Sequence, residues 1–336
     1  MSRLEMTLET EIRRLELAEP FTIATKTWEY AENVFVRLSS NGVQGIGEVS
    51  PEDRKGESAG GVVATLKGLD LSSVSGPFDL ESIRRLLPAG SARCALDIAA
   101  HDLAAKTAGI SVLELIGMAG ARCPATSVTV PITEEAAMVA RAGSFADHPV
   151  VKTKVGFEGD VHALERIREV FPGRIRIDAN EGWDVDTAVR SLKAMEHLDI
   201  ELCEQPIPAG NRDDLARVTE STSIPIYADE DVGTAADVAA LANAVDGVNL
   251  KLRKTGGIRE ALHAIATARA IGLGVMIGCD LESGVATSAE AAVATLADHC
   301  DIDGPLLLAE DPFPTVRYER GEVLLPTGPG LGVVER

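Results

Sequence analysis

The sequence predicts an α/β protein in which a (β/α)-barrel follows a smaller N-terminal unit. Short apolar or alternating runs, each followed by a helical pattern, recur from about residue 124 onward. From the second run to the last, they close at residues 154, 178, 204, 229, 251, 278 and 301, in steps of 22 to 27 residues. One strand, one helix and their loops need about this length. Eight such even units favour a closed barrel over an open sheet.

The chain before this repeat, residues 1–118, is expected to form an α+β unit. Phe35–Leu38, a glycine-rich turn and a second short run indicate two strands joined by a turn. A helical pattern then extends from Ser91, the expected N-cap, to Ala108, and Gly109 is expected to end it.

The barrel itself is expected to occupy residues 119–314. The tail, residues 315–336, has the pattern of a hairpin that turns near Gly321. We expect this tail to return to the N-terminal unit.

Composition excludes several classes of protein. The 336 residues include 52 acidic and 32 basic side chains, which gives a net charge of −20. A negative surface argues against nucleic acid and anionic membranes as partners. The sequence contains no run of about 18 apolar residues, so no membrane span is expected. The five cysteines are scattered, and the first residues lack the pattern of a signal peptide, so a cytoplasmic location is expected.

Carboxylates close three consecutive strands of the repeat. Asp178, Glu204 and Asp229 would meet at the mouth of a barrel, where active sites are built. Three carboxylates in one place repel one another, and a bound cation relieves that repulsion. A ligand set of oxygen atoms alone favours Mg²⁺, with Mn²⁺ as the other option.

Lysines flank these carboxylates on both sides. Lys152 and Lys154 share one face of the second strand, and Lys251 closes the sixth. A lysine near a divalent cation should have a lowered pKa and can act as a general base. Two such lysines on opposite sides of a pocket can exchange a proton on either face of a carbon, while the metal holds a carboxylate and stabilises the enediolate. A single strand-end lysine is usually solvated, so the joint placement carries this interpretation.

Motifs along nearly the whole chain resemble the enolase superfamily, in its muconate-lactonizing-enzyme subgroup. They are Ser91–Asp97, Lys152-Thr-Lys154, Asp178-Ala-Asn180, Glu204-Gln-Pro206, Ala228-Asp-Glu230, Lys251–Gly257 and Pro329–Gly332. The resemblance implies a (β/α)₇β barrel with an N-terminal α+β capping domain that the C-terminal tail completes. It further implies Mg²⁺ on the three carboxylates and Lys154 and Lys251 as the acid/base pair. Lys152 would support the substrate electrostatically, and Asn180 and Glu230 would support the metal ligands.

Asp301-Ile-Asp303 resembles the DxD motif of dipeptide epimerases. A pair of carboxylates suits the ammonium group of an N-terminal amino acid. The implied substrate is a dipeptide whose C-terminal carboxylate lies on Mg²⁺ and whose second residue is inverted at its α-carbon.

Specificity residues are expected in the capping loops and after the seventh strand. Thr25 stands where Ala-Glu epimerases commonly have arginine, Glu52 where aromatic residues are common, and Asp280 where methionine is usual. These residues predict a second substrate residue that is not acidic. Lys26 would favour the reverse.

Other functions remain open on the same scaffold. An N-acylamino acid racemase, a muconate-type cycloisomerase and an o-succinylbenzoate synthase would use a similar barrel. A metal-stabilised binding barrel without catalysis is the alternative of another class, but two opposed lysines have no role in it. Barrels of this subgroup often self-associate, so a homo-oligomer is expected.

Overall fold

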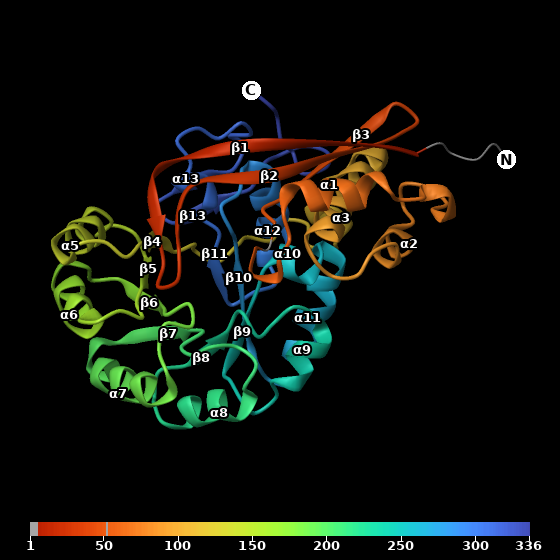
Figure 1. The fold of residues 1–336 in the computed structure, drawn as a ribbon. Helices are drawn as coiled ribbons and strands as arrows, with labels where there is room; N and C mark the ends of the chain where they lie inside the picture. Colours follow the sequence, from red (N-terminus) through yellow and green to blue (C-terminus); the bar gives the residue numbers. More distant parts are fainter. Residues whose placement is uncertain (1–5, 52) are drawn as a thin grey trace.

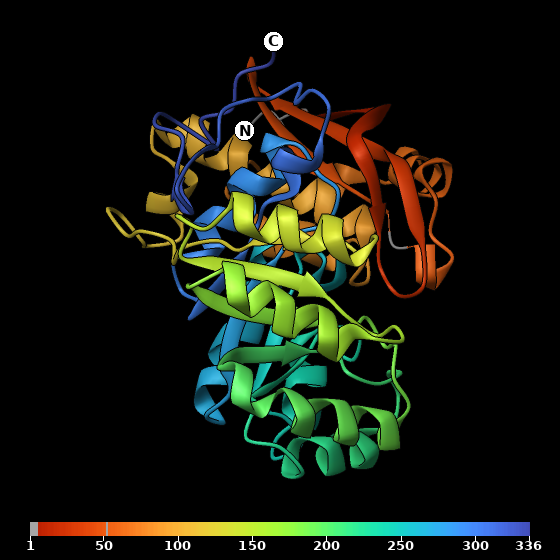
Figure 2. The ribbon, with the colours of Figure 1, turned by 90° about the vertical axis from the view of Figure 1, so that its left-hand side faces the viewer.

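A three-stranded sheet with helices packs on an eight-stranded parallel barrel in the computed structural model, which describes residues 6–51 and 53–336 (Figure 1). Figure 2 shows the barrel helices on the outside of the strands. Within the described residues, no helix is both long and apolar enough to span a membrane.

The N-terminal sheet is antiparallel, in the order β1-β2-β3. Its strands are β1 (Met6–Thr22), β2 (Thr27–Ser40) and β3 (Val43–Val49). Asn41 and Gly42, with φ of 52° and 79°, form the two-residue turn between β2 and β3. The predicted strand-turn-strand is therefore present, but β1 and the first half of β2 were not predicted.

Helix α3 (Ser91–Ala108) packs closely on β3. A Cβ at Gly45 would lie 2.2 Å from the carbonyl oxygen of Ala99, so only glycine permits this approach. Gly109 ends the helix in the left-handed conformation, as predicted. The expected N-cap is wrong by one residue: Gly90 is the N-cap, and the Ser91 hydroxyl bonds Glu57 instead.

The smaller helices of this unit are α1 (Ala59–Lys67), α2 (Leu80–Arg85) and α4 (Val112–Leu115), with 3₁₀ turns at Asp53–Lys55 and Leu71–Ser73. Of these helices, α1 packs on the sheet, whereas α2 and α4 pack against α3.

The barrel has eight strands in chain order, as the repeat predicts. They are β4 (Val128–Val130), β5 (Val150–Lys154), β6 (Arg174–Asp178), β7 (Ile200–Glu204), β8 (Ile226–Ala228), β9 (Gly247–Leu250), β10 (Gly274–Gly278) and β11 (His299–Asp301). A parallel bridge between Thr126, just before β4, and Cys300 of β11 brings the two ends of the sheet together.

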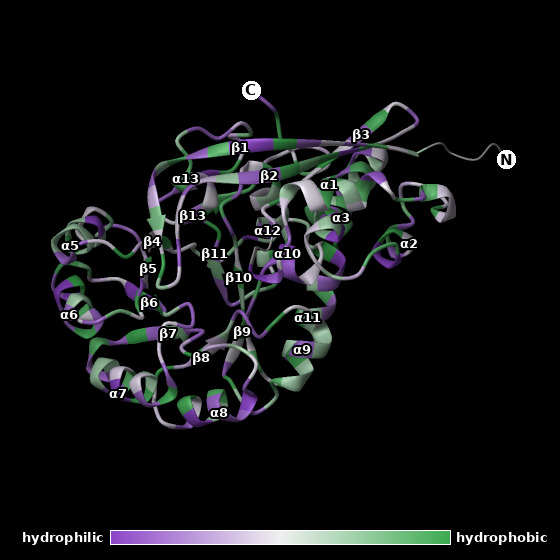
Figure 3. Cartoon of the chain, in the orientation of Figure 1, coloured by the Kyte–Doolittle hydropathy of each residue, from purple (hydrophilic) through white to green (hydrophobic). Residues whose placement is uncertain are grey.

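A helix follows each of the first seven strands, so the topology is (β/α)₇β. The helices are α5 (Glu135–Ser144), α6 (Asp160–Val170), α7 (Val185–Met195), α8 (Arg212–Glu220), α9 (Ala235–Ala240), α11 (Ile258–Ala270) and α12 (Gly284–Ala294); the short α10 (Leu252–Thr255), α13 (Gly304–Leu307) and the 3₁₀ turn Glu196–Leu198 complete the set. Helix α12 is buried along its whole length. Outer helices such as α7 are amphipathic, and Figure 3 shows both hydrophilic and hydrophobic residues along them. In α7, for example, Ala188, Leu192 and Met195 are buried.

The tail forms the predicted hairpin and then reaches the N-terminal unit. Its strands are β12 (Arg317–Glu319) and β13 (Glu322–Leu324). Glu335 bonds Arg13 of β1 and Arg37 of β2, each at 2.5 Å. These contacts fix the tail on the sheet. The predicted domain limits at 118/119 and 314/315 stay predictions.

A buried carboxylate joins the N-terminal sheet to the barrel. Glu48 of β3 accepts hydrogen bonds from the Ser283 N–H at 2.9 Å and the Ala286 N–H at 3.1 Å, at the start of α12. A negative charge is favourable at a helix N-terminus. Asn33 of β2 donates both to Glu48 and to the Leu281 carbonyl. This junction holds the sheet over the end of β10.

Two further buried carboxyls lie beside this junction. Glu282 and Glu290 are 2% and 1% exposed and share a hydrogen bond between their side chains. Burial, together with Asp280, raises the pKa of Glu282 to about 7. Burial and the Glu282 charge raise the pKa of Glu290 well above its ordinary value. The surroundings of Glu290 in the folded protein therefore favour its protonated form.

Replacing Glu290 by Gln should stabilise the protein increasingly as pH rises. The unfolded chain ionises Glu290 near its ordinary pKa of 4.5, whereas the folded chain keeps the proton. Wild-type stability then falls by about 1.4 kcal/mol per pH unit for each retained proton. The melting temperatures of both proteins, followed from about pH 5 to about pH 8, should diverge in favour of E290Q. The exposed Glu220→Gln is the control. A difference that stays constant with pH would contradict this account.

Candidate active site

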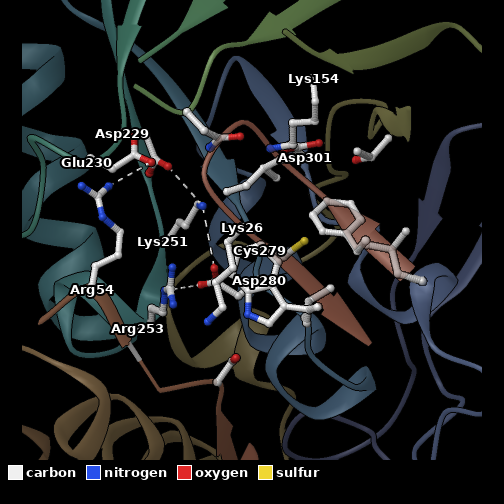
Figure 4. Close-up of a pocket in the computed structure, with 18 of the residues that line it drawn as sticks. Lys26, Arg54, Lys154, Asp229, Glu230, Lys251, Arg253, Cys279, Asp280 and Asp301 are labelled. Atoms are coloured by element: carbon white, nitrogen blue, oxygen red, sulfur yellow. Dashed lines mark ion pairs between the residues drawn. The ribbon is translucent and has the colours of Figure 1, made fainter. Parts of the chain in front are cut away.

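A cavity of about 300 Å³ opens where the barrel strands end and the N-terminal loops cover them. Figure 4 shows the side chains that line it. Of the predicted residues, it is lined by Thr25, Lys26, Lys152, Lys154, Asn180, Asp229, Glu230, Lys251, Asp280, Asp301 and Asp303. Glu52 lies outside the described residues.

Lys152 lies at the centre of the carboxylates. Its Nζ atom is 2.6 Å from Asp301, 2.7 Å from Glu204 and 3.0 Å from Asp178. Burial alone would lower the pKa of Lys152, but these negative charges outweigh it and raise that pKa well above its ordinary value. Lys152 is therefore a fixed positive charge.

The three predicted metal carboxylates close the adjacent strands β6, β7 and the segment after β8. Asp178, Glu204 and Asp229 are 1%, 0% and 2% exposed. Burial and the charge of Asp178 raise the pKa of Glu204 to about 7. Burial disfavours the charge of Asp178 too, but Lys152 and Lys154 hold its pKa at about 2. This cluster is negative and would gain from a cation.

The cluster is not arranged around one point. Among residues 6–51 and 53–336, no group of three acidic, histidine or cysteine side chains is close enough together to hold a metal ion. The carboxylates of the cluster instead form ion pairs with the neighbouring lysines. Two buried acceptors nearby, Asn180 Oδ1 and Glu230 Oε2, lack a hydrogen-bond donor within that described part. A set of buried oxygens with acceptors to spare is the chemistry that a hard cation and its waters prefer.

Lys154 and Lys251 face the cluster from opposite sides. Lys154 closes β5 and Lys251 follows β9, four strands away in an eight-stranded ring. Lys154 Nζ lies 2.6 Å from Asp178. Lys251 Nζ lies 3.1 Å from Asp229 (Figure 4). The pocket between them can present a carbon to a base on each face.

The sequence predicted a lowered lysine pKa, but the side chains around Lys251 raise its pKa instead. Burial lowers the pKa of Lys251, but Asp229 and Asp280 outweigh it and raise that pKa well above its ordinary value. The expectation counted on the charge of a divalent cation, whereas the protein's own groups near Lys251 are mostly carboxylates.

Asp301, the last residue of β11, and Asp303, two residues later, occupy the third side of the pocket. Asp301 bonds Lys152, and Asp303 accepts a hydrogen bond from the Thr129 N–H of β4 at 2.7 Å. Both are buried, at 6% and 3% exposure.

The predicted specificity residues lie at the outer part of the cavity. Lys26 Nζ lies 4.6 Å from the centre of the Trp28 ring. Asp280 pairs with Arg253 at 2.5 Å and lies 3.8 Å from Lys251 (Figure 4).

Sequence reasoning missed three cations at this site. Lys254 bonds both the carbonyl and the carboxylate of Asp229 and so fixes this residue. Arg253 holds Asp280. Arg54, from the loop after β3, pairs with Glu181 and Glu230 and ties that loop to the barrel. The motif Lys251–Gly257 contained a signal for two of them, since one helical turn brings these residues back toward the strand end.

Comparison with known proteins identifies the family. Residues 6–117 match the mandelate racemase / muconate lactonizing enzyme N-terminal domain, and residues 132–335 match the enolase C-terminal domain-like family. The chain belongs to the mandelate racemase / muconate lactonizing enzyme family of the enolase superfamily.

Relatives with assigned names cover almost the whole chain. An L-Ala-D/L-Glu epimerase of Bacteroides thetaiotaomicron is 35% identical over 96% of this chain and 86% of its own length. A hydrophobic dipeptide epimerase of Roseobacter litoralis is 35% identical over 94% of this chain and 95% of its own. The protein is accordingly an isomerase of the epimerase class.

Solved structures agree with this placement. An enolase family member from Agrobacterium tumefaciens, with sodium and L-Ala-L-Glu bound, is 36% identical, with a TM-score of 0.90 over 95% of this chain and 97% of its own. A dipeptide epimerase from Cytophaga hutchinsonii, complexed with Mg and D-Ala-L-Val, is 32% identical, with a TM-score of 0.90 over 99% and 96%. The resemblance and the barrel predicted from the sequence are confirmed.

Proposed function

We propose that this protein is a Mg²⁺-dependent epimerase that inverts the α-carbon of the second residue of an L,L-dipeptide. The observation that carries the proposal is the opposition of Lys154 and Lys251 across buried carboxylates, with Asp301 and Asp303 on a third side. The dipeptides bound by the similar structures support the choice of substrate.

Asp178, Glu204 and Asp229 would hold the metal. When bound, Mg²⁺ would supply a Lewis acid for the substrate's C-terminal carboxylate. The magnesium in the Cytophaga relative supports this choice of cation. Asn180 and Glu230 would support the ligands, because each lies directly beside the cluster.

Lys154 and Lys251 would move the proton. The lysine on one face would remove the α-proton in its neutral form, which a divalent cation on the carboxylates would favour by offsetting the charges that raise the pKa of Lys251. The lysine ammonium on the other face would return a proton, so the centre inverts. The reverse reaction exchanges the two roles. The fixed positive charge of Lys152 would stabilise the enediolate carboxylate.

Asp301 and Asp303 would receive the substrate ammonium. Cycloisomerases, o-succinylbenzoate synthases and N-acylamino acid racemases act on compounds without a free ammonium and gain nothing from this pair. The predicted self-association and cytoplasmic location stay predictions.

We further propose that the second substrate residue is not acidic. Asp280 lines the cavity and is 13% exposed in its side chain. An acidic substrate side chain would place a second carboxylate beside it, which is unfavourable, whereas a cationic one would share Asp280 with Arg253. Lys26, Arg54, Lys55 and Arg253 also line the cavity and carry charges that would favour an acidic side chain.

Adding Mg²⁺ should raise the melting temperature of the wild-type protein. A ligand that binds only the folded state, present at a concentration of about 100 times its Kd, adds about 2.7 kcal/mol to the free energy of unfolding. The Asp229→Asn variant should lose most of this shift, measured by thermal unfolding with and without EDTA. An equal shift in wild type and D229N would contradict the metal site.

Lys154→Ala and Lys251→Ala should each lose about 10²- to 10⁴-fold in epimerisation. Each variant should still exchange the α-proton of one epimer with D₂O, and the retained epimer should differ between the two. NMR of separate L,L- and L,D-dipeptide incubations measures this. Retention of the same epimer by both variants would contradict the two-lysine mechanism.

Asp280→Asn should shift the preference toward an acidic second residue. Removing the charge is expected to raise the kcat/KM for L-Ala-L-Glu, relative to L-Ala-L-Leu, by about 10-fold. Cys279→Ala, a neighbouring change at the cavity wall that removes no charge, is the control. Wild-type enzyme that already prefers L-Ala-L-Glu would overturn the specificity proposal.

A further inference from the structure

Two cations of the candidate active site come from one short helix. Lys251 is the N-cap residue of α10 (Leu252–Thr255), and Lys254 lies within this helix. Lys251 Nζ is 3.1 Å from Asp229 Oδ2, and Lys254 bonds the other oxygen of the same carboxylate. A helix of four residues is not stable by itself, so contacts with other elements must hold this turn in place.

Arg93 supplies such a contact at the C-terminal end of α10. It lies on α3, which packs against α10 and α11 (Figure 1). Its Nη2 donates to the Thr255 carbonyl at 2.6 Å, and its Nε donates to the Gly256 carbonyl at 3.1 Å. The last carbonyls of a helix have no partner within it, and a positive charge is favourable there. A Cβ at Gly256 would lie 2.4 Å from Arg93 Nε and would displace it.

Asp97, one turn further along α3, contacts the start of the next helix. Its carboxylate accepts the Arg259 N–H at 3.3 Å, in the first turn of α11, where a negative charge is favourable. Arg93 and Asp97 are 5% and 0% exposed. Opposite charges of α3 therefore meet the negative end of α10 and the positive end of α11. The motifs Ser91–Asp97 and Lys251–Gly257, far apart in the sequence, come together at this point.

The contacts of Arg93 lead to one side of the active site. Its hydrogen bonds go to the carbonyls of Leu87, Thr255 and Gly256. Lys154 lies across the ring at the end of β5, where Asp178 pairs with it at 2.6 Å. Loss of Arg93 should therefore displace Lys251 and leave Lys154 in place.

We propose that Arg93 is a positioning residue for Lys251, through which the N-terminal unit fixes the place of one of the two acid/base lysines. This inference rests on the proposed function. Arg93 lies outside the lining of the cavity, so it acts through the carbonyls that end α10. With this turn held, Lys251 keeps its place beside Asp229 and faces the substrate carbon.

Exchange of the α-proton with D₂O separates this role from a merely structural one. In the proposed mechanism each lysine removes the α-proton of one epimer only, and Lys251→Ala identifies the epimer that Lys251 serves. Loss of a residue that positions Lys251 slows the exchange of that epimer and spares the exchange that Lys154 performs. General damage to the fold slows both exchanges alike.

The experiment measures both exchanges in Arg93→Met and Arg93→Lys. The substrates are the L,L- and L,D-forms of the dipeptide that wild type converts fastest. Each variant is saturated with Mg²⁺, because Lys254 of the same turn bonds Asp229. In R93M, exchange of the Lys251 epimer should fall about 10- to 100-fold, and the other exchange should stay within about 3-fold of wild type. R93K keeps the charge without the forked geometry, so it should lose about 3- to 10-fold for the same epimer, and it decides the question if R93M does not fold.

Arg168→Met is the matched control. Arg168 also donates to backbone carbonyls, those of Gly173 at 2.7 Å and Leu198 at 3.0 Å, but at the opposite end of the barrel, where β6 and β7 begin. R168M should leave the ratio of the two exchange rates unchanged. Melting curves establish that each variant folds. Amide hydrogen exchange over residues 251–257 should quicken in R93M and not in R168M.

Equal loss of both exchanges in the Arg93 variants, or no change in either, would overturn the positioning role and leave the proposed function standing. A larger loss for the epimer that Lys154 serves would overturn it in the same way. Wild-type enzyme that exchanges the α-proton of neither epimer would overturn the proposed function and this inference together.

Discussion

The buried ammonium of Lys152 is the interaction on which the site depends. It draws together carboxylates from three other segments of the barrel, Asp178, Glu204 and Asp301, all within 3.0 Å of its Nζ atom. Removing one partner from such a set would leave an uncompensated buried charge, which costs several kcal/mol. The set therefore constrains both the closure of the barrel and the chemistry at its mouth. Because the raised pKa keeps Lys152 protonated, its positive charge is available to support a substrate carboxylate.

The N-terminal unit completes this environment from above. Glu48 fastens the sheet to the start of α12, and Arg54 ties the next loop to Glu181 and Glu230. Lys26 and Trp28, from the β1–β2 connection and the start of β2, line the same cavity. Shielding from water strengthens each charge interaction inside the cavity. The ionisable groups at the ends of the barrel strands thus depend on the N-terminal unit for catalysis as well as for stability.

Periodicity and strand-end chemistry predicted most of the fold and of the candidate site, because both depend on local sequence. The helix of residues 91–108 ended at Gly109 as expected, but its N-cap was misplaced, since the Ser91 hydroxyl bonds the distant Glu57. Strand β1 was missed because one face of it is largely exposed and its apolar signal is weak. The pairing of Asp280 with Arg253 joins residues 27 positions apart, and no spacing rule gives it. Contacts between distant segments also set the pKa of Lys251, which the sequence alone could not provide.

The most direct test of dipeptide epimerisation is α-proton exchange by the wild-type enzyme. A mixed L,L-dipeptide library is incubated with enzyme and Mg²⁺ in D₂O, and deuterium uptake is read by mass spectrometry. Removal and return of one proton leave one deuteron on the α-carbon of the second residue. The account predicts that a subset of dipeptides gains one mass unit and that inverted products appear in the same subset. No uptake by folded, metal-bound enzyme, with turnover of N-acylamino acids or muconates instead, would contradict it.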